Sequence, residues 1–188
     1  ALQNTHLTPR LIAFTLTRTV LNTAHRMVYP YLTAFARGLG VDLGTLSYIM
    51  SARALVATVG PLFASLTDRF GRKVGVLAGL GLFTAGAAIV VFSPTLPAFA
   101  ATLILMSFGK YIFDISLASW IGDRVPYERR GRVMAVTEFG WSLAFILGIP
   151  LVGYLIDRDS WDAPFLLLAC LGGAAFVVMT MLIPRDRP

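Results

Sequence analysis

The chain has 188 residues, of which 56% are hydrophobic and only 14% are charged, and its mean hydropathy is +0.73. A soluble domain carries about 25% charged residues, so this composition excludes an ordinary globular domain, and its high hydrophobicity excludes a disordered chain. The single cysteine, Cys170, cannot form an internal disulfide, which excludes a disulfide-rich secreted scaffold. The composition is that of an integral membrane protein.

Six stretches of the sequence are long and apolar enough to cross a membrane as helices, which takes about 20 residues each. The connectors between them are short and rich in turn residues, so none of them can hold a soluble domain. We therefore expect an all-α integral membrane protein consisting of one six-helix bundle. The expected spans are residues 11–36, 43–66, 74–92, 96–121, 133–156 and 163–183.

Basic residues are distributed unevenly between the two ends of these expected helices. The first, third and fifth loops hold only Arg37 and Arg158, whereas the termini and the other two loops hold ten Lys and Arg residues. Because basic loops stay in the cytoplasm, we expect an inner or plasma membrane protein with both termini cytoplasmic. The net charge of +6 then faces anionic lipid headgroups, so we expect no nucleic-acid partner. The ten residues are Arg10, Arg69, Arg72, Lys73, Arg124, Arg129, Arg130, Arg132, Arg185 and Arg187.

The second loop carries a specific motif, which reads ASLTDRFGRK from Ala64 to Lys73. It resembles the G-x-x-x-D-R-x-G-R-[RK] signature between helices two and three of the major facilitator superfamily, with Ala64 in place of the usual glycine. The fourth loop, residues 122–132, is similar to the family's link between helices four and five. The fifth span partly resembles the antiporter motif of the family, although Ile149 interrupts its Gly-Pro pair and Tyr154 replaces a final glycine. Its matching residues are Gly140, Gly148, Pro150 and Gly153.

The resemblance covers the whole chain but only the N-terminal half of a typical twelve-helix member. It implies a half built of two inverted three-helix repeats, and a secondary active transporter that works by alternating access. The second six-helix half would be a further part of a longer protein, a separately encoded chain, or a second copy in a parallel homodimer. The alternative is a non-transporting six-helix membrane subunit or a channel.

An enzyme is not expected, because the chain offers only His6, His25 and Cys170 and no nucleophile elbow. The same three residues form no cluster with metal-ligand spacing, so the sequence predicts neither a metal nor a cofactor.

The resemblance also implies that charged residues at the cytoplasmic end form a latch between the two halves, which breaks when the transporter opens inward. By its own chemistry, Asp68 can accept hydrogen bonds at a helix N-terminus, where the helix dipole favours negative charge. Arg69, Arg72 and Lys73 can pair with carboxylates near the cytoplasmic ends of other helices, for which Asp123 is the candidate. The simpler interpretation, strongest for Lys73, is that the cations only fix the topology. The proposed latch is Asp68, Arg69, Gly71, Arg72, Lys73 and Asp123.

Four ionisable residues fall in the inner part of the expected spans, where a charge is costly and usually functional. Lys110 and Asp114 are four residues apart on one helix face. With Arg18 and Glu138 they make a group of two cations and two carboxylates that can neutralise itself. The Lys110–Asp114 pair is either a plain intrahelical salt bridge or a device that couples a proton or the substrate to a conformational change, and Glu138 has the same potential.

Arg26 and Arg53 lie nearer the outer side and have no carboxylate at their depth. Since an uncompensated buried guanidinium costs several kcal/mol, we expect an anionic or zwitterionic solute to bind near them. The alternatives are that Arg26 extends to the outer headgroups and that Arg53 pairs with a carboxylate from another chain or helix half. His25 points about 100° away from Arg26 on the helix, so it need not share the site.

The solute class is left between two possibilities. The 12% aromatic content suits a drug efflux pump, and the two unmatched arginines suit a carrier of organic anions.

Overall fold

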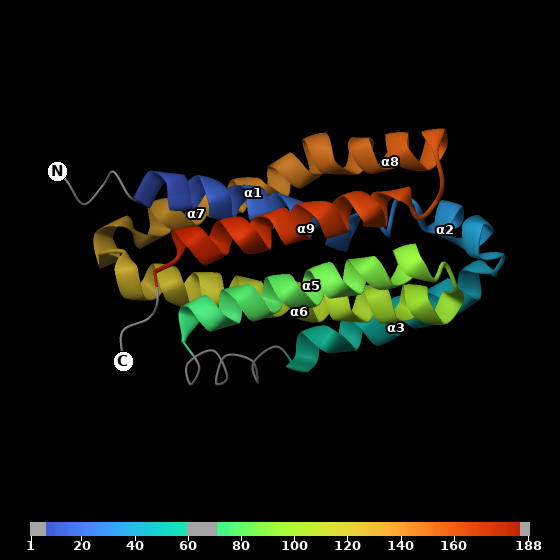
Figure 1. Cartoon of the computed structure of the whole chain (residues 1–188), viewed down its shortest axis with the longest axis horizontal. Coiled ribbons are helices and arrows are strands. Elements are labelled where there is room, and N and C mark those ends of the chain that lie inside the picture. The colour runs from blue at the N-terminus through green and yellow to red at the C-terminus, as the bar shows by residue number, and fades with distance from the viewer. Residues whose placement is uncertain (1–6, 60–70, 185–188) are drawn as a thin grey trace.

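The computed structural model describes residues 7–59 and 71–184, and this part of the chain consists of helices and the turns that join them. The helices form an elongated bundle in which α1 begins and α9 ends at the same end, whereas the α2–α3, α5–α6 and α8–α9 connections lie at the other end (Figure 1). The α-helices are α1 (Leu7–Arg26), α2 (Leu32–Leu39), α3 (Leu43–Leu55), α5 (Arg72–Phe92), α6 (Leu96–Arg124), α7 (Tyr127–Leu143), α8 (Ile149–Arg158) and α9 (Ala163–Leu182). A 3₁₀ turn, η1 (Val56–Val59), follows α3, and a π-helical turn, η2 (Ala144–Gly148), joins α7 to α8.

Within the described residues, four helical runs are long and apolar enough to cross a membrane, namely α5, α6, the continuous run Tyr127–Arg158 and α9. They correspond to the third to sixth expected spans. The first expected span is broken into α1 and α2 by a turn over residues 27–31. Pro30 explains the break, because it has no N–H to donate and disfavours the helical conformation of Tyr29 before it. The second expected span is α3 and η1, and its remainder lies outside the described residues.

The connector between α6 and α7 is much shorter than the sequence predicted. Helix α6 continues to Arg124 and α7 starts at Tyr127, so the expected loop over residues 122–132 is reduced to Val125 and Pro126. That prediction was wrong because hydropathy marks where the apolar part of a helix ends, and a polar helix can continue beyond it. Arg130 supports the corner by donating to the carbonyl oxygens of Val125, at 2.9 Å, and Gly122, at 2.5 Å.

Local sequence signals explain two helix starts, those of α3 and α6, at the end of the bundle that holds the α2–α3 and α5–α6 connections. Asp42 caps α3, because its carboxylate accepts from the Thr45 hydroxyl at 2.6 Å and the Thr45 amide at 3.0 Å. The side-chain hydrogen bond from Thr45, followed by the backbone one, holds the pKa of Asp42 below its ordinary value. Thr95 caps α6 in the same way, through the Ala98 amide, and Pro97 occupies the first turn where no N–H is needed.

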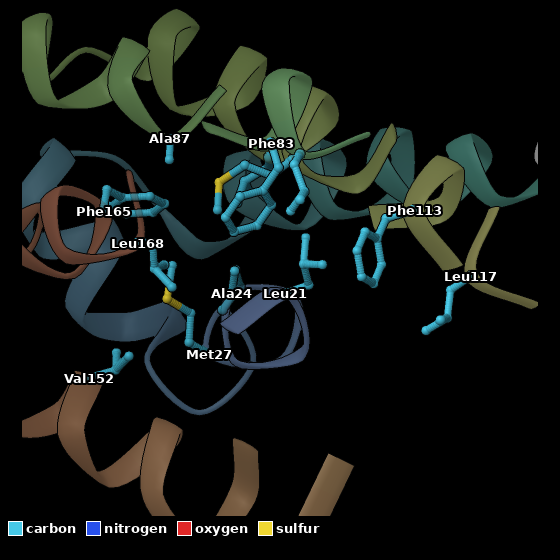
Figure 2. Packing of buried hydrophobic residues seen from close by; sticks show 14 of the residues in the cluster. Leu21, Ala24, Met27, Phe83, Ala87, Phe113, Leu117, Val152, Phe165 and Leu168 are labelled. Carbon is cyan, nitrogen blue, oxygen red and sulfur yellow. The ribbon is translucent and has the colours of Figure 1, made fainter. Parts of the chain in front are cut away.

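The hydrophobic core lies where α1, α5, α6 and α9 meet. Phe83 and Ala87 of α5 point toward Leu168 of α9, and Leu21 of α1 reaches the same region (Figure 2). At the end nearest the α5–α6 turn, an aromatic group packs with ring centroids between 5.4 and 5.9 Å apart. That group consists of Phe35, Phe99 and Phe165, which tie α2, α6 and α9 together.

Glycines set the closest helix crossing, between α5 and α6. A Cβ on Gly109 would lie 2.5 Å from the carbonyl oxygen of Gly79 and 2.6 Å from the backbone nitrogen of Phe83. Both neighbours are backbone atoms, so a side chain at Gly109 must push the helices apart. Small residues allow such an approach in membrane helices, where dispersion contacts drive association.

We therefore expect Gly109→Ala to lower the free energy of unfolding by about 1–3 kcal/mol through overpacking. The matched control is Gly81→Ala on α5, where the new Cβ meets only the Phe176 ring at 3.7 Å, an ordinary contact. Denaturant unfolding of both variants in the same detergent measures the difference. Equal stability of the two variants would show that α5 and α6 can accommodate a methyl group at Gly109, which would contradict the close packing described here.

Glycines also bring α7, η2 and α8 against the first span, which runs parallel to them. Gly140 packs on Arg18 and Thr15, Gly148 packs on Thr23, and Gly153 packs on the Tyr31 ring. These are the glycines of the partial antiporter motif, and their observed contacts are all with α1 or the turn that follows it.

Candidate functional site

Four ionisable side chains from three helices form one ionic network in the interior of the bundle. Arg18 of α1 donates to Asp114 of α6 at 3.1 Å and to Glu138 of α7 at 2.6 Å. Lys110 donates to the other oxygen of Asp114 at 2.5 Å, one helical turn away. The residue Lys110 is 5% exposed, whereas the side chain of Glu138 is 51% exposed. Asp114 is thus the centre of the network, and Glu138 is its open edge.

The network is electrically balanced, with two cations and two carboxylates. The sequence predicted that these residues can neutralise one another, and the structure brings them together. Asp114 is more than the partner of Lys110 on its own helix, because it also holds Arg18 of α1. A relative movement of α1 against α6 therefore changes the number of cations at this carboxylate.

Arg53 of α3 makes a different set of contacts and is 4% exposed. Its Nε donates to the Ser107 hydroxyl at 2.9 Å, and its Nη2 donates to the His25 carbonyl oxygen at 2.7 Å and lies 2.5 Å from Nδ1 of the same residue. The third nitrogen faces the Met50 sulfur at 3.8 Å. Arg53 has no carboxylate partner among the described residues, and its donors are directed to acceptors of the bundle itself.

His25 is a residue that the sequence interpretation missed. It was set aside because it points away from Arg26, but the same direction brings it to Arg53 and to the Tyr111 ring, 6.1 Å between centroids. The His25 carbonyl lies in the last turn of α1. In a regular helix it would accept from the Tyr29 amide, but that amide donates to the Arg26 carbonyl instead. The signal in the sequence was Pro30, since a broken helix frees carbonyl groups that need another donor.

Arg26 stacks on aromatic rings instead of pairing with an acid. Its guanidinium carbon lies 4.5 Å from the centroid of Trp141 and 5.7 Å from that of Phe145. Lys110 lies 5.6 Å from the same Trp141 ring, so two cations share one indole. The buried Nε of Arg26 has no hydrogen-bond partner in the described part of the chain.

The part of the latch that the structure describes includes one ion pair. Arg72, at the start of α5, donates to Asp123 near the end of α6 at 2.9 Å, as expected. Gly71 precedes α5 with φ of 94°, a conformation that a residue with a side chain rarely adopts. Lys73 donates instead to the carbonyl oxygens of Thr180 and Ile183 at the end of α9. Asp68 and Arg69 lie outside the described residues.

No group of three or more His, Cys, Asp or Glu side chains within residues 7–59 and 71–184 is arranged to hold a metal ion.

Comparison with known proteins decides the family. Residues 14–188 match the family model of the Major Facilitator Superfamily. The chain belongs to the major facilitator superfamily. The superfamily consists of membrane transporters rather than enzymes, which agrees with the apolar helices of the bundle.

Three curated relatives within the superfamily illustrate the range of similarity. An uncharacterized MFS-type transporter, YwfA of Bacillus subtilis, is 30% identical over 163 residues, covering 85% of this chain and 40% of YwfA. A multidrug resistance protein B homolog of Mycobacterium tuberculosis is 29% identical, covering 82% of this chain and 29% of the relative. A chloramphenicol resistance protein of Streptomyces lividans is 28% identical, covering 89% and 43% respectively. The chain thus spans less than half the length of these relatives.

Proposed function

We propose that this chain forms one six-helix wall of the solute pathway in a secondary active transporter that works by alternating access. In this proposal the chain comprises two inverted three-helix repeats and lies in an inner or plasma membrane with both termini cytoplasmic. The observation that carries the proposal is the network of Arg18, Lys110, Asp114 and Glu138 inside the bundle. Ionisable groups at membrane depth mark ion or substrate pathways far more often than they stabilise a fold.

The network supports a coupling role because Asp114 and Glu138 share one cation. Arg18 bridges α6 and α7, so a rearrangement that withdraws it leaves Glu138 without this partner and Asp114 with Lys110 alone. Loss of a neighbouring cation favours the protonated form of a carboxylate, and its return favours release of the proton. A proton taken up on one side and released on the other would then drive the transported solute.

The Arg72–Asp123 pair supports the cytoplasmic latch. It joins the ends of α5 and α6 beside the loop that carries the signature motif, and Asp68 and Arg69 of that motif complete the latch in this proposal. The second six-helix half supplies the opposite wall, as part of the same polypeptide, as a separate chain, or as a second copy. The names of two relatives include multidrug and chloramphenicol resistance, which supports drug-like solutes. Organic anions are the second class of proposed solute, and they are supported by Arg26, which has an unused donor.

The latch gives the most direct test of alternating access. In everted membrane vesicles with an imposed pH gradient, we expect Asp123→Asn to reduce solute flux by about tenfold, because Arg72 loses a charge-assisted partner that closes the cytoplasmic side. The probes are radiolabelled chloramphenicol and benzoate, one drug-like and one anionic. Asp159→Asn, in the α8–α9 turn at the other end of the bundle, is the control and should transport as the parent does. Equal flux in Asp123→Asn and the parent, at equal membrane insertion, would contradict the latch, and a parent that moves neither probe would contradict the solute assignment.

A further inference from the structure

The positive charges in the spans are not equivalent, and their contacts separate them into three kinds. Arg18 and Lys110 are neutralised by Asp114 and Glu138. Arg53 donates hydrogen bonds to the His25 carbonyl and the Ser107 hydroxyl. Arg26 has two aromatic rings over its guanidinium and a buried Nε without a partner. Arg26 is therefore the cation of this group that retains hydrogen-bonding capacity for a ligand.

The space around Arg53 supports this separation. The cavity beside Arg53 and His25 has a volume of about 10 Å³, which is at the lower limit for a single water molecule. It is lined mainly by core residues, including Leu21, Phe83 and Leu103. In this structure the space beside Arg53 is too small for a solute, and its donors are taken up by His25 and Ser107.

Asn22 provides an independent observation next to Arg26. It precedes Arg26 by one helical turn and follows Arg18 by one, so the three residues form a stripe along one face of α1. It is 1% exposed, yet neither its Oδ1 nor its Nδ2 has a hydrogen-bond partner in the described part of the chain. Since buried amides are nearly always hydrogen-bonded, an amide without a partner calls for a ligand or another specific explanation.

The two ends of this stripe face α6 and α7. Arg18 reaches Asp114 and Glu138, and Arg26 reaches Trp141, which also lies against Lys110. Asn22 lies between these two levels. The site therefore combines an unused guanidinium nitrogen and an unused amide with the aromatic surface of Trp141 and Phe145.

We propose that Asn22 and Arg26 bind the carboxylate of an amphiphilic organic monoanion, whose apolar part lies against Trp141 and Phe145. Arg26 brings one positive charge and an unused donor, which predicts one negative charge on the ligand, and the guanidinium with the amide offers donors suited to the two oxygens of a carboxylate. The inference rests on the proposed transport function and specifies its solute. Asn22 lies one turn deeper in α1 than Arg26, which favours a small solute over the headgroup of a lipid at the interface.

Asn22→Leu is the sharpest variant, because a structural asparagine and a ligand-binding asparagine predict opposite results. The leucine removes an amide that has no partner, so the thermal midpoint of the protein without ligand should stay the same or rise. The affinity for benzoate, measured by isothermal titration of the full-length protein in a nonionic detergent, should fall about tenfold, as expected for loss of a hydrogen bond to a charged group. A fall in the thermal midpoint with unchanged benzoate affinity would overturn the proposal.

Arg26 and the charge of the ligand are tested in the same titration. Arg26→Gln should abolish measurable benzoate binding, Arg26→Lys should retain part of it, and the exposed Arg37→Gln is the control that should bind as the parent does. Benzamide, the neutral analogue, should not bind the parent. Equal binding of benzoate and benzamide, or of benzoate by Arg26→Gln and the parent, would overturn the proposal.

Lipid binding and transport failure can be distinguished from each other. If phosphatidylglycerol stabilises the parent but not Arg26→Gln, while benzoate does nothing, then the site holds a lipid and the proposed solute is wrong. If the parent transports chloramphenicol but does not bind benzoate, the monoanion assignment fails while the transport function stands. If benzoate binds through Asn22 and Arg26 but no probe crosses the membrane, the site stands and alternating access fails.

Discussion

Replacement of Asp114 by asparagine is expected to lower the free energy of unfolding by about 3 kcal/mol, the low end of the cost of breaking a buried ion pair. Asparagine keeps the shape of the side chain but removes the charge that Arg18 and Lys110 share. Lys110, at 5% exposure, then becomes a buried cation without its carboxylate. Denaturant unfolding in detergent, followed by circular dichroism, measures the loss.

The matched control is the double variant Lys110→Met/Asp114→Asn, which removes one charge of each sign. Arg18 and Glu138 remain as a pair at 2.6 Å, so the double variant should regain most of the lost stability. This non-additivity is the signature of a direct interaction in a double-mutant cycle. If the double variant is as unstable as the sum of the two single variants, Asp114 does not act through Lys110.

Replacement of Arg53 by leucine is expected to cost about 2–4 kcal/mol, because the part-buried His25 carbonyl and the buried Ser107 hydroxyl each lose a donor. Relief of the buried guanidinium charge offsets part of this cost. The effect should be concentrated at the break in the first span, since the His25 carbonyl lies in the last turn of α1. Hydrogen exchange at the amides of residues 27–29 and 31 should therefore accelerate together with the loss of global stability.

Arg37→Leu serves as the control for this prediction. Arg37 lies on α2 and is exposed, and its Nε donates to the Thr33 carbonyl on its own helix at 3.4 Å. The free energy of unfolding of Arg37→Leu should lie within about 0.5 kcal/mol of the parent's, as is usual for surface substitutions. Unchanged exchange at residues 27–29 and 31 in Arg53→Leu would mean that Arg53 does not hold the break in place.

Several features of the site were predictable because they follow from short sequence separations or from charge alone. The Lys110–Asp114 pair follows from the helical repeat, and the pairing of Arg72 with Asp123 follows from the need of a cation for a carboxylate at the same end of the bundle. The neutrality of the inner network followed from counting charges at similar depth. These arguments do not depend on which helices are neighbours.

The remaining features depend on packing that hydropathy does not encode. The sequence placed Arg26 and Arg53 together because both lack an acid, but α1 directs Arg26 toward Trp141 while α3 directs Arg53 toward His25 and Ser107. The helix break near Pro30 freed the acceptor that Arg53 uses. Gly140 and Gly148 lie in close contact with α1. These two residues of the partly matched antiporter motif therefore pack helices together, which the sequence pattern did not indicate.

The central claim is that the charges inside the bundle serve transport and do not merely hold the helices together. The measurement that tests it most directly is the flux of chloramphenicol and benzoate by the Lys110→Met/Asp114→Asn double variant in vesicles with an imposed pH gradient. We predict that this variant is nearly as stable as the parent but transports neither solute against its gradient, because the carboxylate that exchanges partners is gone. A stable double variant that transports as fast as the parent would show that the network is structural and would contradict the account.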